Sequence, residues 1–133
     1  MAEPTRGVLD TSVVIDLDRI DPSRLPDEST ITAVTLAELA AGPLATLDEQ
    51  ERARRQDRLQ WAAATWEALP FDVDAARAYG RVFAATKAAG RTSRSRLADL
   101  LIASTAASRG LSLYTRNPGD FVGLEGVLNV IVV

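Results

Sequence analysis

The chain has neither cysteine nor histidine among its 133 residues. Without thiols it can form no disulfide, no thiolate zinc site and no cysteine nucleophile. Without imidazole it can form no Ser-His-Asp triad, no imidazole-based zinc site and no histidine acid–base pair. Any catalysis must therefore rely on carboxylates, hydroxyls, arginine, the single lysine Lys87 or a bound metal ion. Carboxylates without such neighbours suit hard cations such as Mg²⁺ or Mn²⁺.

Long apolar runs are also missing: none reaches the roughly 18 residues that a membrane span needs. The N-terminal sequence MAEPTRGVLD has neither the basic start nor the apolar stretch of a secretory signal. We therefore expect a cytoplasmic protein that does not enter a membrane. The net charge of −3 and the pI near 4.9 argue against nucleic-acid binding by a basic patch alone.

The length of the chain gives room for one domain, residues 1–133, around one sizeable core. Short apolar or β-branched runs alternate with helical patterns, which predicts an α/β fold with a central parallel sheet between helices. The expected strands are 7–9, 30–34, 69–71, 111–115 and 127–133. Five helices are expected. The first begins at 11, the second runs through 36–40, and the others cover about 46–69, 72–89 and 97–108.

Local signals set the expected helix ends. Thr46 and Glu49 match a capping box at the start of the long helix, and its arginines 52, 54, 55 and 58 predict a solvated face. Asp72 or Asp74 can cap the next helix. In that helix, Ala76, Gly80 and Phe83 are expected to share an apolar face, and Gly90 is expected to end it.

Asp10 directly follows the first expected strand, and ligands of parallel sheets bind beyond the carboxyl ends of the strands. A helix N-cap is the alternative role for this acid. Phosphotransfer receivers and haloacid-dehalogenase-like phosphatases also begin with an acid at a strand end. The first class needs a lysine near the last strand, whereas Lys87 lies on a middle helix. The second needs another aspartate where Ser12 stands, so both classes are disfavoured.

Three further acids stand in contexts where a carboxylate is unusual or well placed. Glu38 has apolar flanks, which suggests an inward position, although Thr35 and Glu38 also match a capping box. Asp99 interrupts an otherwise apolar helix, where the helix dipole or pairing with Arg96 could equally explain it. Asp120 follows the strand and turn at 111–119, and a solvated loop acid is its alternative role.

Four short motifs contain these acids in order along the chain. They are L-D-T-S at 9–12, T-x-x-E-L at 35–39, D-x-x-I-A at 99–103 and T-R-N-x-x-D-F at 115–121. Each motif is unspecific alone, but their combination over nearly the whole chain resembles the PIN-domain family. The size and layout are similar to those of the VapC-type toxins of bacterial toxin–antitoxin pairs.

The resemblance implies a PIN-like three-layer α/β/α sandwich and a Mg²⁺-dependent endoribonuclease, with Mn²⁺ as a substitute, that leaves a 5′-phosphate and a 3′-hydroxyl. Asp10 and Asp99 would be the strongest metal ligands, joined by Glu38 and Asp120. Ser12, Thr115 and Asn117 would be supporting polar residues. The resemblance further implies a type II toxin with a cognate antitoxin protein as partner, in a homodimer or a toxin–antitoxin hetero-oligomer.

The residue chemistry agrees with this interpretation, because crowded carboxylates repel one another and a divalent cation relieves that repulsion. Such a cation can polarise a phosphoryl group and lower the pKa of its bound water. Four arginines could hold the RNA backbone near the pocket: Arg91, Arg94, Arg96 and Arg116. The main alternative is a catalytically inactive PIN-like module that binds RNA or protein, and a phosphotransfer receiver is the third hypothesis.

Overall fold

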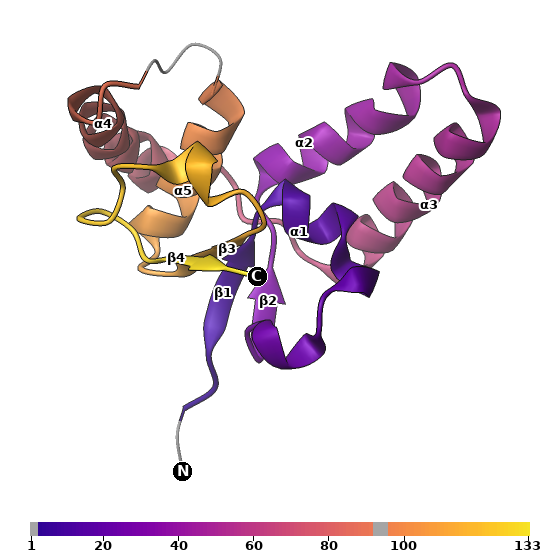
Figure 1. Cartoon of the computed structure of the whole chain (residues 1–133), viewed down its shortest axis with the longest axis horizontal. Coiled ribbons are helices and arrows are strands. Elements are labelled where there is room, and N and C mark those ends of the chain that lie inside the picture. The colour runs from indigo at the N-terminus through magenta and orange to yellow at the C-terminus, as the bar shows by residue number, and fades with distance from the viewer. Residues whose placement is uncertain (1–2, 92–95) are drawn as a thin grey trace.

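A parallel sheet with strand order β2-β1-β3-β4 forms the centre of the computed structural model (Figure 1). The structure describes residues 3–91 and 96–133. The strands are β1 (Arg6–Leu9), β2 (Glu28–Thr30), β3 (Ser112–Thr115) and β4 (Val130–Val132). The α-helices are α1 (Thr11–Ile15), α2 (Ala33–Ala41), α3 (Glu49–Thr65), α4 (Val73–Ala88) and α5 (Leu97–Ser108). The short 3₁₀ helices are η1 (Leu17–Arg19), η2 (Pro22–Arg24), η3 (Gly42–Ala45) and η5 (Pro118–Phe121).

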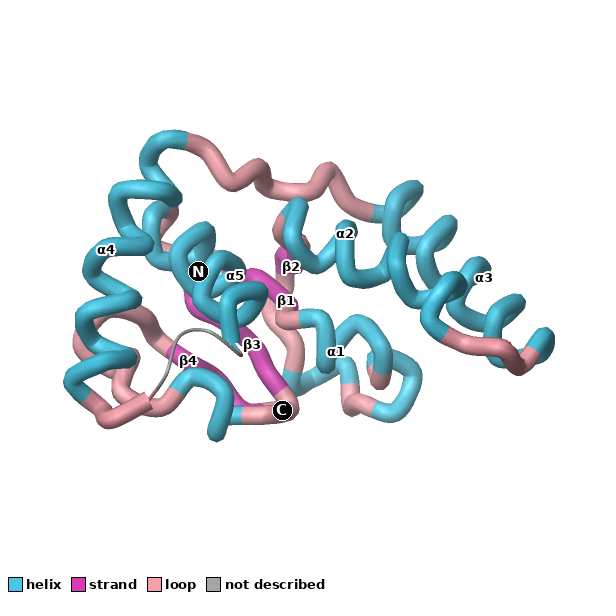
Figure 2. The backbone as a smooth tube through the Cα atoms, turned by 90° about the horizontal axis from the view of Figure 1, so that it is seen from above, coloured by secondary structure: helices cyan, strands magenta, loops and turns pink. Residues whose placement is uncertain are grey.

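Helices cover both faces of this sheet, with α4 and α5 on one side and α1, α2 and α3 on the other (Figures 1 and 2). Side chains of a strand point alternately to opposite faces. Val8 and Leu113 accordingly join the core under α4 and α5, whereas their neighbours Leu9 and Tyr114 join the core under α1 and α2. The predicted three-layer α/β/α sandwich with a central parallel sheet is confirmed.

The position of β1 creates a crevice for a site. The chain passes from β1 to β2 on one side of it and later returns to β3 on its other side. Connections that leave two neighbouring strands in opposite directions open a crevice at their carboxyl ends. Asp10 follows β1 at this edge, and Thr115 ends β3 beside it.

Three strand predictions differ from the structure. The run at 30–34 is not a strand: β2 ends at Thr30, and the Thr32 hydroxyl accepts a hydrogen bond from the Thr35 N–H at 3.1 Å as the cap of α2. The hydrogen bond of this cap starts a helix where the β-branched residues had predicted a strand. The strand expected at 69–71 is reduced to one bridge between Thr32 and Leu69, and the last strand spans Val130–Val132 only.

Several helix details also differ from the predictions. Asp48, not Thr46, caps α3, and α3 ends at Thr65 instead of about residue 69. In α4 the buried face contains Ala75 and Val82, whereas the predicted face of 76, 80 and 83 is exposed. The helix has alanine on both of these faces, and the face with Ala75 and Val82 is the one that packs against α5. The bounds of α5 and the Asp72 cap of α4 are confirmed.

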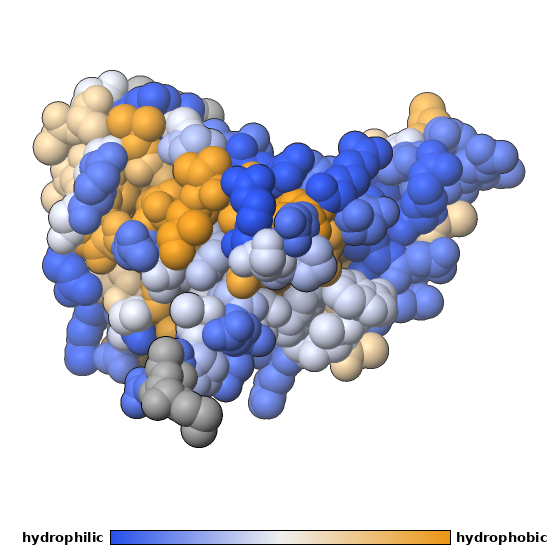
Figure 3. Space-filling model, turned by 60° about the horizontal axis from the view of Figure 1, so that its bottom comes forward, coloured by the Kyte–Doolittle hydropathy of each residue, from blue (hydrophilic) through white to orange (hydrophobic). Residues whose placement is uncertain are grey.

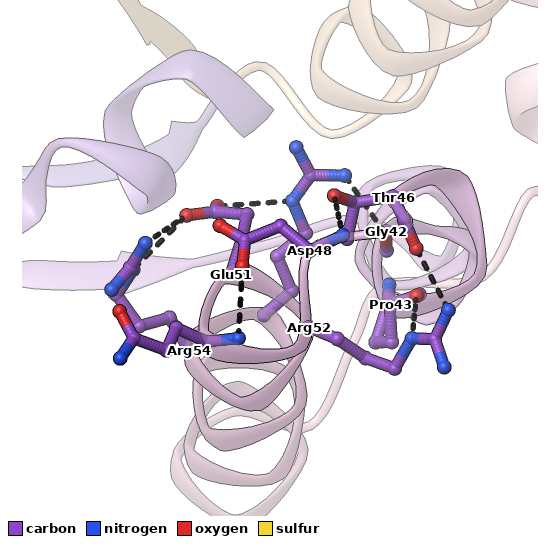
Figure 4. A network of polar contacts seen from close by, with 9 residues as sticks. Gly42, Pro43, Thr46, Asp48, Glu51, Arg52 and Arg54 are labelled. Atoms are coloured by element: carbon purple, nitrogen blue, oxygen red, sulfur yellow. Dashed lines mark hydrogen bonds and ion pairs between the residues drawn. The ribbon is translucent and has the colours of Figure 1, made fainter.

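The helices α2 and α3 form an arm whose turn is fixed by arginines (Figure 4). Arg52 donates to the carbonyl oxygens of Pro43 at 3.1 Å and Thr46 at 2.8 Å, and Arg55 donates to that of Gly42 at 2.9 Å. These two side chains therefore do more than form the predicted solvated face. The outer surface of the arm is largely hydrophilic (Figure 3). Within the described residues, no helix is long and apolar enough to cross a membrane.

Gly7 and Gly80 provide a matched test of the packing in this fold. A Cβ atom at Gly7 would lie 2.3 Å from the Tyr114 ring, whose side chain is buried, whereas one at Gly80 in α4 would meet nothing within 4 Å. We expect Gly7→Ala to lower the free energy of unfolding by about 1–3 kcal/mol, and Gly80→Ala to raise it by about 0.5–1 kcal/mol. Urea unfolding measures both. Equal effects of the two substitutions would contradict the packing of Tyr114 on Gly7.

Candidate active site

Asp10 is a buried carboxylate held by hydroxyl groups, and only 3% of its surface is exposed. Its Oδ1 accepts a hydrogen bond from the Thr11 N–H at 2.8 Å. Its Oδ2 accepts from the hydroxyls of Ser12 and Thr115, both at 2.9 Å. A carboxylate has about four acceptor positions, of which these bonds use three. Asp10 is thus the N-cap of α1 and still has acceptor capacity for a further ligand.

The same hydroxyls bind the loop after β3 to Asp10. The Ser12 hydroxyl accepts from the Arg116 N–H at 3.1 Å, and the Thr115 hydroxyl accepts from the Asn117 N–H at 2.9 Å. The chain therefore turns at the end of β3 against the network around Asp10. Ser12 and Thr115, predicted as supporting polar residues, lie in this network, whereas Asn117 joins it through its backbone and has an exposed side chain.

Burial raises the pKa of Asp10 above its usual range, because a charge is poorly solvated there. The hydrogen bonds from Thr115, Ser12 and Thr11 oppose that rise, and the nearby charge of Asp120 adds to it. The site thus combines a costly buried charge with donors that compensate for it.

Glu38 lies on α2 and reaches toward the start of α1. The Thr11 hydroxyl donates to its Oε1 at 2.6 Å and lies 3.0 Å from the hydroxyl of the buried Thr35. Glu38 is exposed, so the expectation of an inward, apolar position was wrong. The capping-box interpretation of Thr35 and Glu38 was also wrong, because Thr32 caps this helix. The Thr11 hydroxyl orients the Glu38 carboxylate instead, and the Thr35 hydroxyl lies next to that of Thr11.

Asp99 lies in the first turn of α5 and is half-buried. Its pKa is raised to about 6, first by burial and then by the charges of Asp120, Asp10 and Glu38, in that order. Arg96 opposes this rise only weakly, as the last of the causes. The suggested pairing of Asp99 with Arg96 is not the contact that forms: Arg96 binds Asp120, with 3.1 Å between Nη1 and Oδ1.

All four predicted acids therefore share one electrostatic environment at the carboxyl edge of the sheet, although they come from four different segments. Across residues 3–91 and 96–133, no three acidic side chains lie close enough to hold a metal ion as they stand. Their chemistry nevertheless fits a hard divalent cation: the oxygens are carboxylate oxygens, and the mutual repulsion that raises the pKa of Asp99 is what such a cation relieves. Asp10, which is buried, and Asp99, which is half-buried, would hold it most directly.

The predicted arginines occupy different places around this edge. Arg116 pairs with Asp16, with 3.4 Å between Nε and Oδ2, and both side chains are half-buried. Arg96 pairs with Asp120, and Arg91 is half-buried beyond the end of α4. Arg94 lies outside the described residues.

Three contributors to the site were missed: Thr11, Thr35 and Asp16. Thr11 and Thr35 each stand inside a motif that was recognised for its acid, so the signal was present but assigned to the neighbouring residue. Asp16 had no local signal, because its partner Arg116 lies 100 positions away in the chain.

Comparison with known proteins places this arrangement in a family. Residues 7–122 match the PIN domain. The chain belongs to the PIN-domain family. It is 41% identical to ribonuclease VapC5 of Mycobacterium tuberculosis over 98% of this chain and 96% of the relative. It is 32% identical to the VapC ribonuclease Y4jK of Sinorhizobium fredii over 86% of this chain and 89% of the relative.

A solved structure agrees with the PIN assignment. The crystal structure of the toxin–antitoxin system VapBC-5 from Mycobacterium tuberculosis matches with a TM-score of 0.84 and 42% identity, over 98% of both chains. The predicted resemblance to VapC-type PIN domains is confirmed.

The raised pKa of Asp99 predicts an unusual dependence of stability on pH. Because the folded pKa of about 6 exceeds the ordinary aspartate value of 3.8, the native state binds the proton more tightly, and stability falls as pH rises from about 4 to above 6. Asp99→Asn removes this loss. We expect the metal-free variant to be level with the parent near pH 4 and up to about 1 kcal/mol more stable at pH 7, allowing for solvent screening.

Urea unfolding in chelator at both pH values measures this difference. Asp74→Asn is the matched control, since Asp74 is an exposed first-turn acid of α4 that faces Arg77. It should lose about 0.3–1 kcal/mol at pH 7. A similar loss for Asp99→Asn would contradict its place among like charges.

Proposed function

We propose that this protein is a metal-dependent endoribonuclease and the toxin of a type II toxin–antitoxin pair. The observation that carries the proposal is the mutual influence of Asp99 with Asp10, Glu38 and Asp120 at the sheet edge. The relatives named ribonucleases, at 41% and 32% identity, support the activity. The VapBC-5 structure, in which a relative is part of a toxin–antitoxin system, supports the biological role.

The more firmly held acids would bind the metal ion, and the more exposed acids would act on the water. Asp10, fixed by its three donors, and Asp99, on the first turn of α5, would hold a Mg²⁺ or Mn²⁺ ion. Glu38 and Asp120 would complete the acidic pocket and orient the water that attacks the phosphorus. When bound, the ion polarises the phosphoryl group and lowers the pKa of that water. In-line attack would leave a 5′-phosphate and a 3′-hydroxyl.

The arginines near this edge would contact the RNA backbone. Arg96 and Arg116 each neutralise an acid close to the pocket, so the local charge is less negative than the acids alone suggest. Phosphate contacts of this kind position RNA without reading its sequence. Together with the ion, they would offset the repulsion that the net charge of −3 implies.

The first test is RNA cleavage by the purified chain. Cleavage should require Mg²⁺ or Mn²⁺, stop with EDTA, and fall on the order of 100-fold or more in Asp10→Asn and Asp99→Asn. Asp74→Asn, far from the pocket on α4, should keep the parental rate. Undiminished cleavage in excess chelator would reject the proposed chemistry. RNA binding without cleavage would favour the inactive binding module.

A groove beside the pocket is our proposed contact for the antitoxin. One hollow of about 340 Å³ is lined by Val14, Ile15, Leu17, Asp18, Arg58 and Trp61. A second, of about 360 Å³, shares Ile15 and Arg58 with the first and extends to Thr11 and Glu38. Trp61 is 49% exposed and packs edge-on against Trp66, whose ring centroid is 5.1 Å away. A partner segment in this groove would cover both an apolar surface and the edge of the acidic pocket.

Trp61→Ala tests this interface, because Trp66 packs against the core and would confound the result. We expect the affinity for the antitoxin encoded with this chain to fall about 30-fold or more, as for a tryptophan at the centre of an interface. Phe83→Ala, which removes an aromatic ring 38% exposed on α4, should change the affinity less than about threefold. Isothermal titration of the purified pair measures both. Equal losses would place the interface elsewhere, and failure to form any complex would reject the toxin role.

A further inference from the structure

Arg96 lies at the start of α5 and reaches the loop that carries Asp120. Its Nη1 is 3.1 Å from Asp120 Oδ1 and also approaches the carbonyl oxygen of Gly119 at 3.4 Å. The side chains of Arg96 and Asp120 are 26% and 38% exposed, so water screens this ion pair less than a fully exposed one. The contact therefore joins two charged side chains that are partly shielded from water.

The geometry of this contact differs from a strong arginine–carboxylate fork. In a fork, two N–H groups bind the two carboxylate oxygens in parallel. The bond to Asp120 uses Nη1 alone and the oxygen Oδ1 alone. Such a one-point contact fixes the carboxylate less firmly than a fork, and a competing cation can displace it more easily.

Arg96 also acts on the rest of the pocket. Its charge opposes the rise in the pKa of Asp99, while the charge of Asp120 is the largest carboxylate contribution to that rise. The guanidinium thus adds a positive charge to the acidic group, and among the described acids it pairs with the one from the loop after β3.

We propose that Arg96 is a positioning residue that holds Asp120 as an internal counter-ion and releases it when a divalent cation binds the pocket. This inference rests on the proposed metal site. A guanidinium and a divalent cation compete for the same carboxylate, and the cation carries the greater charge. The ion pair would therefore lower the affinity of the pocket for metal, and it would free the guanidinium beside the RNA once metal is bound.

The competition can be measured without any cleavage assay, by calorimetric titration of Mn²⁺ into the purified chain. Arg96→Gln should tighten Mn²⁺ binding about three- to tenfold, because Asp120 no longer has to leave a partner. In an Asp120→Asn background, the same change should alter the affinity less than about twofold. Arg109→Gln is the matched control: it removes the same charge from the partly buried pair with Asp72 at the other end of α5 and should also change the affinity less than about twofold.

The outcomes separate this inference from simpler ones. If Arg96→Gln raised the Mn²⁺ affinity equally in the parent and in Asp120→Asn, the cause would be a general charge effect. That result would overturn the proposed exchange, in which the metal ion replaces Arg96 at Asp120. Unchanged or weaker binding by Arg96→Gln would also overturn it. Failure of the parent to bind Mn²⁺, or normal binding by Asp99→Asn, would instead reject the metal site itself.

A second measurement covers the case in which Arg96→Gln does not fold. Addition of Mg²⁺ to the parent chain should shift the side-chain NMR signal of Arg96 while leaving that of Arg109 in place, and Asp120→Asn should abolish the shift. An Arg96 signal that does not respond to saturating Mg²⁺ would overturn the exchange.

Discussion

The buried carboxylate of Asp10 is the constraint on which the edge of the sheet depends. A charge that is 3% exposed is costly unless donors satisfy it. Thr11, Ser12 and Thr115 supply those donors, and they bring together the end of β1, the start of α1 and the end of β3. The position of each neighbouring element is thus tied to one side chain, which is also the innermost acid of the candidate pocket.

The acids differ in how firmly the fold holds them. Asp10 has three short donor contacts, whereas Glu38 is exposed and is oriented by the Thr11 hydroxyl, and Asp120 by one guanidinium nitrogen. This gradient explains why the four acids influence one another while no three of them, within the described residues, form a ready metal cage. In such a pocket Asp10 is held in place, whereas Glu38 and Asp120 can change position. This suits a site that must admit both an ion and a bulky phosphodiester.

The sequence predicted the parts of this site that follow from local pattern and chain direction. Strand-end acids of a parallel sheet meet at one edge, so Asp10 and the loop after β3 could be placed together before the structure was known. The segment of α5 was predictable because its apolar run ends at a glycine turn. The strand expected at 30–34 failed because the Thr32 hydroxyl caps α2, a choice that depends on where the helix packs.

Contacts between distant residues could not be read from local pattern. Arg96 has an acid three positions ahead in its own helix, yet its guanidinium reaches Asp120, 24 positions away. The local pairing would have given Asp99 a partner and lowered its pKa. Because the loop after β3 takes that partner, Asp99 stays half-buried among like charges, and its pKa is raised first by burial and then by those charges. The property that makes Asp99 a candidate ligand is therefore produced by the tertiary fold, which buries the carboxylate among other acids and gives the neighbouring arginine to Asp120.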